Sequence, residues 1–446
     1  MWYYENPVLI FMLKKLKLNK DNNEIIRKGF SFFVIRSIGL LASYFFAFII
    51  ARQFGASIYG IVAICFSILL FASVFSRLGL DINLVRYYSD GKKWDESGLF
   101  LRVIIKSFIF SIFIVLFLFL FKHLLVYKLF QKPILSVYFN WILFTIPLWT
   151  IVVVSGSLFQ AKRNNNLFAF LNNPGRFLFS ILFLFIFYLI SKDPIIIVQA
   201  HFFGVLLLAI ISLIYSFKCF SEITLKSKFN SFVFLRESIP MMVSGASLIL
   251  LGGLDTFILG IYDSEENIGV YNISLKLATV TLISLQAINS ILMPKVAESF
   301  KTGDTKRFNK VISFSTNLNF LITIIVVIFI LIFRIQILSL FGEEFLKGES
   351  ILILLCIAQI INSFSGSVGV ILQMTGNQIV FQNIILIALL INICLNFLLI
   401  PIYGSYGAAL TTLISIAFWN FSGAYYLNRK HNIISYFNCK NLNNGN

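Results

Sequence analysis

The stretch ARQFGASIYGIVAICFSILLFASVFSRLGLDINLVRYY, residues Ala51–Tyr88, contains the pattern that decides the fold. Its apolar run over residues 59–82 is long enough to cross a bilayer, because a spanning helix needs about 20 mostly apolar residues. A second apolar run, over residues 30–51, precedes it, and a short polar turn that contains Gly55 separates the two. Both runs are continuous and do not alternate, so the pattern predicts a hairpin of two membrane-spanning helices.

The composition of the whole chain agrees with a membrane environment. Of its 446 residues, 59% are hydrophobic and only 12% are charged, whereas soluble domains are about 25% charged. Phenylalanine alone supplies 51 residues, and the mean hydropathy is +0.89. This composition excludes a soluble enzyme, a nucleic-acid-binding domain and a disordered protein, and the continuous apolar runs exclude a β-barrel. We therefore expect an all-α polytopic membrane protein.

Twelve apolar runs are candidate membrane-spanning helices. The polar links between them are short, which leaves no room for a soluble domain of any size. The twelve runs cover residues 30–51, 59–82, 103–121, 137–160, 175–190, 195–217, 238–261, 271–293, 312–333, 350–372, 383–402 and 406–427.

The positions of Lys and Arg predict the orientation of these helices. Placing the N-terminus inside puts 25 of the 36 basic residues in inner segments and 7 in outer loops, while 4 fall within helices. Because cytoplasmic loops are enriched in Lys and Arg, this bias predicts that both termini are cytoplasmic. The chain then divides into a cytoplasmic N-terminal tail (1–29), an N-terminal six-helix lobe (30–217), a cytoplasmic linker (218–237), a C-terminal six-helix lobe (238–427) and a cytoplasmic C-terminal tail (428–446).

The chain repeats itself at two similar offsets. GSLFQAKRNNNLF at residues 156–168 matches GVILQMTGNQIVF at residues 369–381 with an offset of 213. IYGIVAI at residues 58–64 matches NIGVYNI at residues 267–273 with an offset of 209. Both matches connect corresponding helices, and an even number of helices in each half gives the halves the same orientation. We therefore expect two lobes related by a pseudo-twofold axis along the membrane normal, with a substrate path at their interface.

These features resemble the polysaccharide exporters of the Wzx type, in the multidrug/oligosaccharidyl-lipid/polysaccharide exporter superfamily. The resemblance rests on the G-x-x-x-Y-G turn at Gly55–Gly60, on Arg86 at the end of the second helix, on the ENIGVYN turn at residues 266–272 and on the Q-x-x-x-N element at Gln160–Asn164. It covers the whole chain in helix number and layout. It implies inward- and outward-facing states around a central cavity, and transport of an oligosaccharide linked to undecaprenyl diphosphate between the leaflets.

Ionisable residues inside the predicted helices are the first candidates for function, because a charge at the bilayer centre costs about 2.5–3.5 kcal/mol on insertion scales. Arg36 lies about two turns into the first helix, and Asp81 lies at a similar depth in the second. Arg77 and Asp81 are one turn apart on one helix face. Two interpretations are open. These residues form a structural network in which Asp81 neutralises the arginines, or Arg36 and Arg77 bind the substrate diphosphate and Asp81 binds a coupling ion.

Asp255 and Lys276 lie at matching depth in the hairpin of the seventh and eighth predicted helices. The structural alternative is an ion pair between them, and the functional alternatives are coupling to H⁺ or Na⁺ at Asp255 and substrate binding at Lys276. Asn392 and Asn396 share a helix face and are expected to form interhelical hydrogen bonds, and His201 is expected at a membrane interface. No catalytic residue, cofactor or metal site is expected.

The embedded charges favour a flippase for a lipid-linked oligosaccharide, such as an O-antigen or capsule repeat unit. Four of the six embedded ionisable residues are basic, and a diphosphate needs fixed positive charge in a poorly hydrated path. A multidrug or organic-cation antiporter of the same superfamily, which would favour carboxylates inside, is the alternative. A membrane polysaccharide polymerase is less favoured because the outer loops are short.

The expected setting follows from these inferences. We expect a multi-pass protein of the bacterial cytoplasmic (inner) membrane, in contact with membrane lipids and with the lipid-linked oligosaccharide. A polysaccharide polymerase and a chain-length regulator are candidate protein partners, and nucleic acid is not an expected partner.

The predicted topology can be tested by cysteine labelling. In a cysteine-free background, a cysteine at Asn230 lies in the predicted cytoplasmic linker 218–237. A membrane-impermeant maleimide should leave it unlabelled in intact cells and label it after permeabilisation. Labelling in intact cells would rule out two six-helix lobes with cytoplasmic termini.

Overall fold

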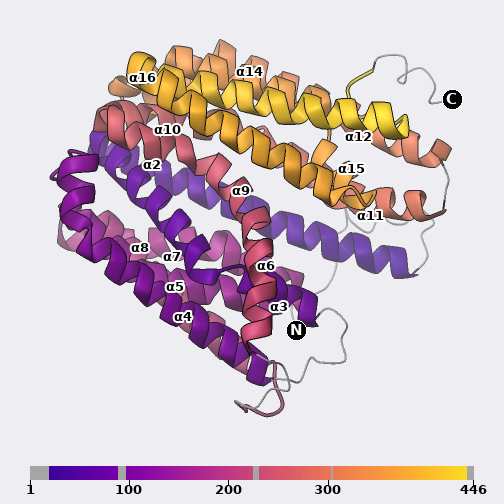
Figure 1. The fold of residues 1–446 in the computed structure, drawn as a ribbon. Helices are drawn as coiled ribbons and strands as arrows, with labels where there is room; N and C mark the ends of the chain where they lie inside the picture. Colours follow the sequence, from indigo (N-terminus) through magenta and orange to yellow (C-terminus); the bar gives the residue numbers. More distant parts are fainter. Residues whose placement is uncertain (1–19, 89–96, 225–230, 303–304, 439–446) are drawn as a thin grey trace.

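The computed structural model describes residues 20–88, 97–224, 231–302 and 305–438, and every element within these ranges is helical. The N-terminal half of the described chain, drawn from indigo to magenta in Figure 1, ends at residue 224. Its elements are α2 (Lys20–Arg77), α3 (Leu80–Tyr88), α4 (Ser97–Leu120), the π-helical turn η1 (Leu124–Leu129), α5 (Leu135–Ala161), α6 (Asn165–Asn172), α7 (Pro174–Ile190) and α8 (Ile196–Phe217).

The C-terminal half of the described chain begins at residue 231 and is drawn from pink to yellow (Figure 1). Its elements are α9 (Ser231–Tyr262), α10 (Glu265–Thr279), α11 (Leu282–Thr302), α12 (Thr305–Ile332), α13 (Arg334–Phe341), the 3₁₀ turn η2 (Glu343–Gly348), α14 (Glu349–Ser365), α15 (Val368–Met374) and α16 (Gln378–His431).

Glycines in the left-handed region divide the two longest helices. α2 is interrupted at Gly55 (φ +82°) and α16 at Gly404 (φ +53°), conformations that other residues adopt only at a steric cost. Eight described helices are long and apolar enough to cross a membrane, and two bent pairs, α6 with α7 and α10 with α11, complete two further spans. When α2 and α16 are counted as two spans each, the described chain has the twelve spans that the hydropathy pattern predicts.

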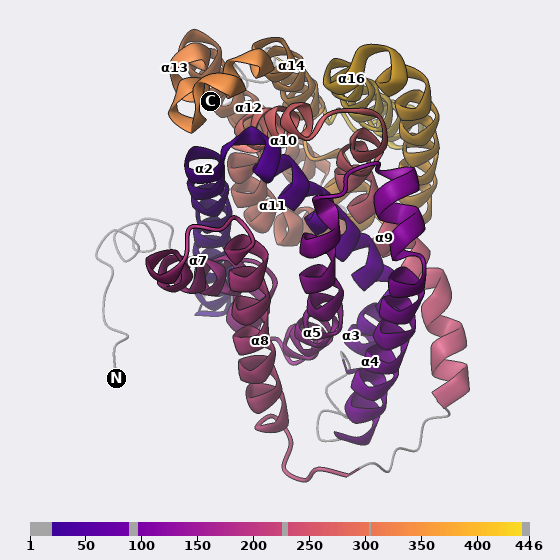
Figure 2. The same cartoon turned by 90° about the vertical axis from the view of Figure 1, so that its left-hand side faces the viewer.

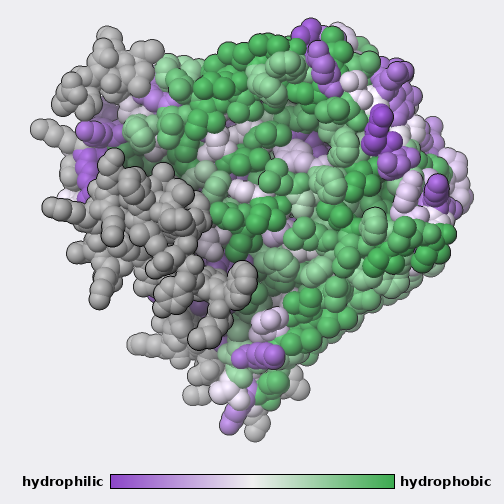
Figure 3. Space-filling view, turned by 180° about the vertical axis from the view of Figure 1, so that it is seen from behind, coloured by the Kyte–Doolittle hydropathy of each residue, from purple (hydrophilic) through white to green (hydrophobic). Residues whose placement is uncertain are grey.

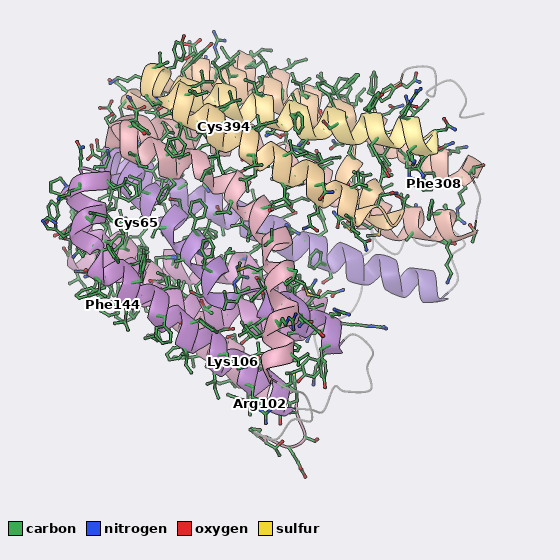
Figure 4. All side chains as sticks on the ribbon, in the orientation of Figure 1. Cys65, Arg102, Lys106, Phe144, Phe308 and Cys394 are labelled. Atoms are coloured by element: carbon green, nitrogen blue, oxygen red, sulfur yellow. The ribbon has the colours of Figure 1, made fainter. Side chains whose placement is uncertain are left out.

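The outer surface is apolar, as a bilayer requires. Phe113 and Phe117 on α4 leave 62% and 57% of their surface exposed, and Phe144 on α5 also points outward (Figure 4). Figure 3 shows a broad apolar surface with hydrophilic residues gathered at its margins. Because exposed phenylalanines are stable against lipid chains but not in water, the chain is a multi-pass membrane protein.

The internal repeat is present in the backbone as well as in the sequence. The turn between α5 and α6 and the turn between α15 and α16 each contain a residue in the left-handed region, Arg163 (φ +60°) and Gly376 (φ +80°). These two residues differ by the repeat offset of 213. In both turns the amide of the next residue donates a hydrogen bond over 2.8 Å to a carbonyl five residues back. The two halves therefore share one local conformation at equivalent positions.

The two halves meet where α2 crosses α10, and this contact is itself twofold. A Cβ on Gly60 would lie 1.9 Å from the carbonyl oxygen of Glu265, and a Cβ on Gly269 would lie 2.1 Å from that of Ala56. The repeat offset of 209 relates the two glycines to each other, and it relates the two carbonyls in the same way. The backbones touch directly, so the crossing requires small residues at both positions.

Polar contacts join the halves at the same end of the molecule. The Glu344 carboxylate accepts a hydrogen bond from the amide of Ala56 at 2.5 Å, and the Lys132 ammonium donates to the carbonyl of Asp263 at 2.8 Å. Burial lowers the pKa of Lys132, and the carboxylates of Glu265 and Asp263 partly offset that effect. We call this the closed end and the opposite end the far end. The closed end lies at the left of Figure 1 and faces the viewer in Figure 2.

The structure corrects the start of the fifth span. The hydropathy pattern begins this span at residue 175, but α6 begins at Asn165, and α6 and α7 form one path bent by 45°. Pro174 occupies the first turn of α7, where a missing amide leaves no hydrogen bond unmade. The polar sequence before Pro174 is therefore part of a broken membrane-spanning helix and not a loop. Arg176 stands at the edge of the predicted span 175–190 and is counted with the inner basic residues in the positive-inside pattern, but it lies well inside the broken helix that begins at Asn165.

Other boundaries also differ from the sequence prediction. α2 begins at Lys20, ten residues before the predicted first span. α9 continues through the predicted boundary between linker and lobe, and its first turns pack on α3, where the Asn83 amide donates to the carbonyl of Phe234 at 3.1 Å. Residues 1–19 and the labelling position Asn230 lie outside the described residues. The division into tails, linker and lobes stays a prediction.

Alanine at either crossing glycine should weaken the closed end. A Cβ at Gly60 or Gly269 overlaps a backbone carbonyl, so the helices must separate, and overpacking of this kind costs about 1–3 kcal/mol. We expect Gly60→Ala and Gly269→Ala each to lower the Tm of the purified protein by about 3 °C or more. Gly252→Ala is the matched control, because a Cβ at this helical position meets nothing within 4 Å. Equal Tm values for the three variants would contradict the direct backbone contact.

Candidate functional site

A cavity of about 580 Å³ lies between the two halves. The N-terminal half contributes α2 and α7 to its wall, and the C-terminal half contributes α9, α10, α11, α14 and both parts of α16. Aromatic and aliphatic side chains form much of the wall. The charged and amide side chains that line it are Arg176, Asp255, Asn272, Lys276, Gln286, Gln359, Asn362 and Asn392. One ligand in this space can contact both halves at once.

Arg176 enters the cavity wall from the first turn of α7 and is only 6% exposed. Three aromatic rings surround its guanidinium, with centroids at 4.9 Å for Trp149, 5.1 Å for Phe66 and 5.3 Å for Phe177. Cation–π contacts stabilise a cation by about 0.5–2 kcal/mol without neutralising it. A full positive charge is therefore held at the cavity wall.

A buried histidine fixes the orientation of this arginine. Arg176 Nε donates to His201 Nε2 over 3.2 Å, and His201 Nδ1 lies 3.0 Å from Ser180 Oγ. Ser180 uses its own proton to bond the Arg176 carbonyl at 2.7 Å, so Nδ1 must be the donor and His201 is neutral. His201 is fully buried on α8, which contradicts the interfacial position expected from sequence.

Lys276 reaches the cavity from the other half of the protein. It lies in the last turn of α10, and its ammonium donates to Ser43 Oγ at 2.8 Å and lies 5.4 Å from the ring centroid of Tyr44. The Tyr44 hydroxyl in turn lies 3.3 Å from Thr279 Oγ1. Ser43 and Tyr44 belong to α2, so these contacts hold Lys276 against the N-terminal half through neutral groups.

Arg176 and Lys276 together form a cationic site without a local counter-ion. Both side chains line the same cavity. Within the described parts of the chain, neither has a carboxylate oxygen within 4 Å. Charge interactions are strong where water is scarce, and an uncompensated buried charge is unfavourable. The site is therefore suited to an anionic ligand that satisfies both cations.

Asp255 on α9 lies at the same cavity, buried and fully supplied with hydrogen-bond donors. Its Oδ1 accepts from the amides of Asn392 at 3.1 Å and Asn396 at 2.6 Å. Its Oδ2 accepts from the hydroxyls of Tyr271, at 2.9 Å, and Thr412. Four neutral donors compensate the buried carboxylate. Among the described atoms, Asn396 Oδ1 is left without a partner, so this cluster keeps an oxygen available to a cation.

The ion pair considered between Asp255 and Lys276 is not formed. Asp255 bonds to α10 and α16, whereas Lys276 bonds to α2. Matching depth brings two residues to the same level, but it does not decide which way each side chain points around its helix. Asn392 and Asn396 do form the expected interhelical hydrogen bonds, and Asp255 is their shared acceptor.

The remaining sequence candidates lie outside this cavity. Arg77 and Asp81 form a buried ion pair with 2.6 Å between Nη1 and Oδ2, and they line a separate pocket of about 50 Å³. The structural interpretation is confirmed for Arg77 and Asp81, whereas the pairing of Asp81 with Arg36 that it also included is not formed. Arg36 is half-buried on α2, has no ion-pair partner among the described residues and is not among the side chains that line the cavity.

Two family models match the chain. The model described as "Polysaccharide biosynthesis protein" matches residues 25–300, which is more than half of the sequence. The model described as MatE matches residues 240–398. The two matches together include the segments that carry Arg176, Lys276 and Asp255.

Two curated proteins are similar to part of the chain. The probable low-salt glycan biosynthesis flippase Agl15 of Haloferax volcanii is 29% identical over 175 residues, which cover 39% of this chain and 37% of that protein. An uncharacterized membrane protein of Methanocaldococcus jannaschii is 28% identical over 195 residues, which cover 43% of this chain and 45% of that protein. The chain spans less than half the length of each of these relatives.

Solved structures share the fold at low sequence identity. A lipid II flippase MurJ in an inward closed conformation has a TM-score of 0.73 at 18% identity, covering 93% of this chain and 89% of that chain. A MATE family multidrug resistance transporter in an inward-facing conformation has a TM-score of 0.72 at 14% identity, covering 89% and 98%. An outward-facing conformation of such a transporter has a TM-score of 0.62 at 15% identity, covering 92% and 95%. The fold is that of two-lobed helical transporters.

Proposed function

The chain belongs to the polysaccharide biosynthesis protein family, and we propose that it moves an undecaprenyl-diphosphate-linked oligosaccharide from the inner to the outer leaflet of the cytoplasmic membrane. We infer that it acts as a membrane transporter of the flippase type and not as an enzyme, which the family match and the similarity to a probable glycan biosynthesis flippase support. The proposed cargo is the repeat unit of an O-antigen or capsule. The diphosphate would bind in the cavity, while the polyprenyl chain stays in the bilayer.

The observation that carries this proposal is the pair of cations, Arg176 buried and Lys276 half-buried, that the two halves contribute to one cavity. Arg176 comes from the N-terminal half and Lys276 from the C-terminal half. A guanidinium binds phosphate through two parallel hydrogen bonds, and an ammonium acts as a point charge. Their present partners are aromatic rings, a neutral imidazole and a hydroxyl. None of these neutralises a cation, so a diphosphate gains attraction from both.

The cavity also has the size of a ligand site. Its volume of about 580 Å³ lies within the range of about 300–1,000 Å³ that is usual for small-molecule pockets. Such a space accommodates a diphosphate with the first sugar of a glycan. The apolar parts of its wall, which include Leu40, Leu70 and Leu251, remain available to the first part of the lipid.

Transport requires that the cavity opens alternately at its two ends. The halves touch at the closed end, through Gly60 and Gly269 and through the contacts of Glu344 and Lys132. The positive-inside pattern places these loops outside the cell. We therefore infer that the structure represents an inward-facing state.

We propose that Asp255 couples transport to a cation, either Na⁺ or H⁺. Asparagine amides and hydroxyls can rotate to present oxygen atoms, and hard cations prefer oxygen ligands. Protonation of Asp255 would instead remove the negative charge that the four hydrogen-bond donors stabilise. The cluster joins α9, α10 and both parts of α16, so its occupancy acts on the packing of the C-terminal half around the cavity.

An organic-cation antiporter is the second candidate, because the MatE model matches residues 240–398 and aromatic rings such as those of Tyr44 and Tyr59 line the cavity. The charges oppose it. Arg176 and Lys276 repel a cation, and the carboxylate of Asp255 is already compensated by neutral donors. The cavity therefore favours an anionic substrate.

Removing either cavity cation should weaken binding of the diphosphate. For Arg176→Gln and for Lys276→Gln, the Kd of undecaprenyl diphosphate in detergent should rise about tenfold or more, because a hydrogen bond to a charged group contributes about 1.5–3 kcal/mol. Arg52→Gln is the matched control, since Arg52 is exposed and does not line the cavity. In a flippase-null strain, both cavity variants should lose surface polysaccharide at equal membrane protein levels.

Two outcomes would contradict this proposal. The first is normal surface polysaccharide with Arg176→Gln and Lys276→Gln combined in one protein. The second is tight binding of a lipophilic cationic dye together with no measurable affinity for undecaprenyl diphosphate, which would support the antiporter instead.

Two neighbouring threonines provide a matched test of the coupling proposal. Thr412 donates to Asp255, whereas the buried hydroxyl of Thr411 has no partner among the described atoms. If Na⁺ is the coupled ion, replacing Na⁺ with choline should lower the Tm of the wild-type protein. If H⁺ is the coupled ion, transport should depend on pH but not on Na⁺. Asp255→Asn and Thr412→Val should abolish whichever dependence is found, and Thr411→Val should keep it. Unchanged ion dependence in Asp255→Asn would exclude Asp255 from coupling.

A further inference from the structure

A second pocket of about 550 Å³ adjoins the central cavity on the side of the far end. α9 and α16 run along both spaces, and Leu248 lines both. On α16, Ile385 lines the pocket and Asn392 lines the cavity, a separation of about two helical turns. The two spaces are therefore stacked along the helix axes, with α3 and α15 completing the wall of the pocket.

Three glutamines give this pocket its polar character. Gln373 lies on α15, and Gln378 and Gln382 are four residues apart on one face of α16. In the described parts of the chain, none of these three side-chain amides has a hydrogen-bond partner in the protein. Each amide can donate two hydrogen bonds and accept two. The pocket thus offers several donors and acceptors that the protein itself does not use.

The rest of the pocket wall is mainly apolar. Phe381 lines it and is backed by the indole of Trp419, with 6.4 Å between ring centroids. Arg86 also lines the pocket, and no carboxylate does so among the described residues. An apolar wall with a few placed polar groups is the usual design of a small-molecule site. This combination suits a ligand that carries many hydroxyl groups.

The internal repeat distinguishes one of these amides, Gln382, from the framework that the two halves share. At the repeat offset of 213, Gln378 corresponds to Asn165 and Gln382 corresponds to Ala169 in the first half. The backbone of the preceding turn is nevertheless shared between the halves. The amide of Gln382 is therefore a feature of one half, whereas Gln373 and Gln378 occupy positions that also carry amide side chains, Gln160 and Asn165, in the first half.

We propose that this pocket binds sugar residues of the lipid-linked substrate, and that Gln373, Gln378 and Gln382 hold their hydroxyl groups. The inference rests on the proposed function, which places the diphosphate at Arg176 and Lys276. A glycan joined to that diphosphate extends along α9 and α16 towards the far end and enters the pocket. A sugar hydroxyl both donates and accepts hydrogen bonds. The NH₂ group and the oxygen of a glutamine amide can satisfy both roles.

The test compares the natural glycan-bearing substrate with a sugar-free carrier. In cells that make the natural substrate and lack the chromosomal copy of this protein, Gln378→Leu with Gln382→Leu should reduce surface polysaccharide at least fivefold. The purified double variant should bind undecaprenyl diphosphate, which has no sugar, with the affinity of the wild type. Asn383→Leu is the matched control, because Asn383 is an exposed amide on the same helix that does not line the pocket. It should change neither measurement.

Each outcome decides the inference. Normal surface polysaccharide in the double variant overturns it, and so does an equal loss of affinity for the sugar-free carrier, which would assign the pocket to the polyprenyl chain. If the double variant is poorly inserted, the single changes Gln378→Ala and Gln382→Ala at matched membrane levels replace it, with the same expected results. Failure of the proposed function is distinguishable, because Arg176→Gln and Lys276→Gln would then leave the affinity for undecaprenyl diphosphate unchanged.

Discussion

The crossing of α2 and α10 is the contact on which the rest of the structure depends. At Gly60 and Gly269 the backbone of each helix occupies the space that a Cβ would need. This close approach brings Lys276 onto Ser43 and Tyr44 of the opposite half. A wider crossing would leave this half-buried lysine without its hydrogen-bond acceptor, which is costly in a medium of low dielectric constant. The same small residues therefore close one end of the molecule and hold a cation over the cavity.

The presence or absence of an oppositely charged partner separates structural charged residues from candidate functional ones. Arg77 and Asp81 neutralise each other in a pocket too small for a substrate. Arg176 and Lys276 instead have neutral partners only, as far as the described residues show, and they face a space of about 580 Å³. Keeping such charges uncompensated has an energetic cost. An anionic ligand that neutralises both cations removes this cost, so both halves contribute to its binding free energy.

The sequence predicts the framework of this protein better than it predicts the site. Apolar runs and repeat offsets are patterns of spacing along the sequence, so the twelve spans and the twofold relation can be predicted from them. Lys276 and Asp255 are found because they are charged residues within apolar runs. Arg176 is not found, because the NNPG sequence before it is typical of a loop, and only the proline in a first turn signals that a helix continues there. Pairing by depth fails for Arg36, because depth does not fix the direction of a side chain around its helix.

The central claim is that one diphosphate bridges the two halves at Arg176 and Lys276. A cryo-EM structure of the wild-type protein in lipid nanodiscs, with undecaprenyl-diphosphate-linked glycan added, tests it most directly. We predict density for two phosphates between the guanidinium and the ammonium, with the Lys276 side chain turned away from Ser43. A diphosphate bound elsewhere, with Arg176 still enclosed by Trp149 and Lys276 still bonded to Ser43, would contradict the claim.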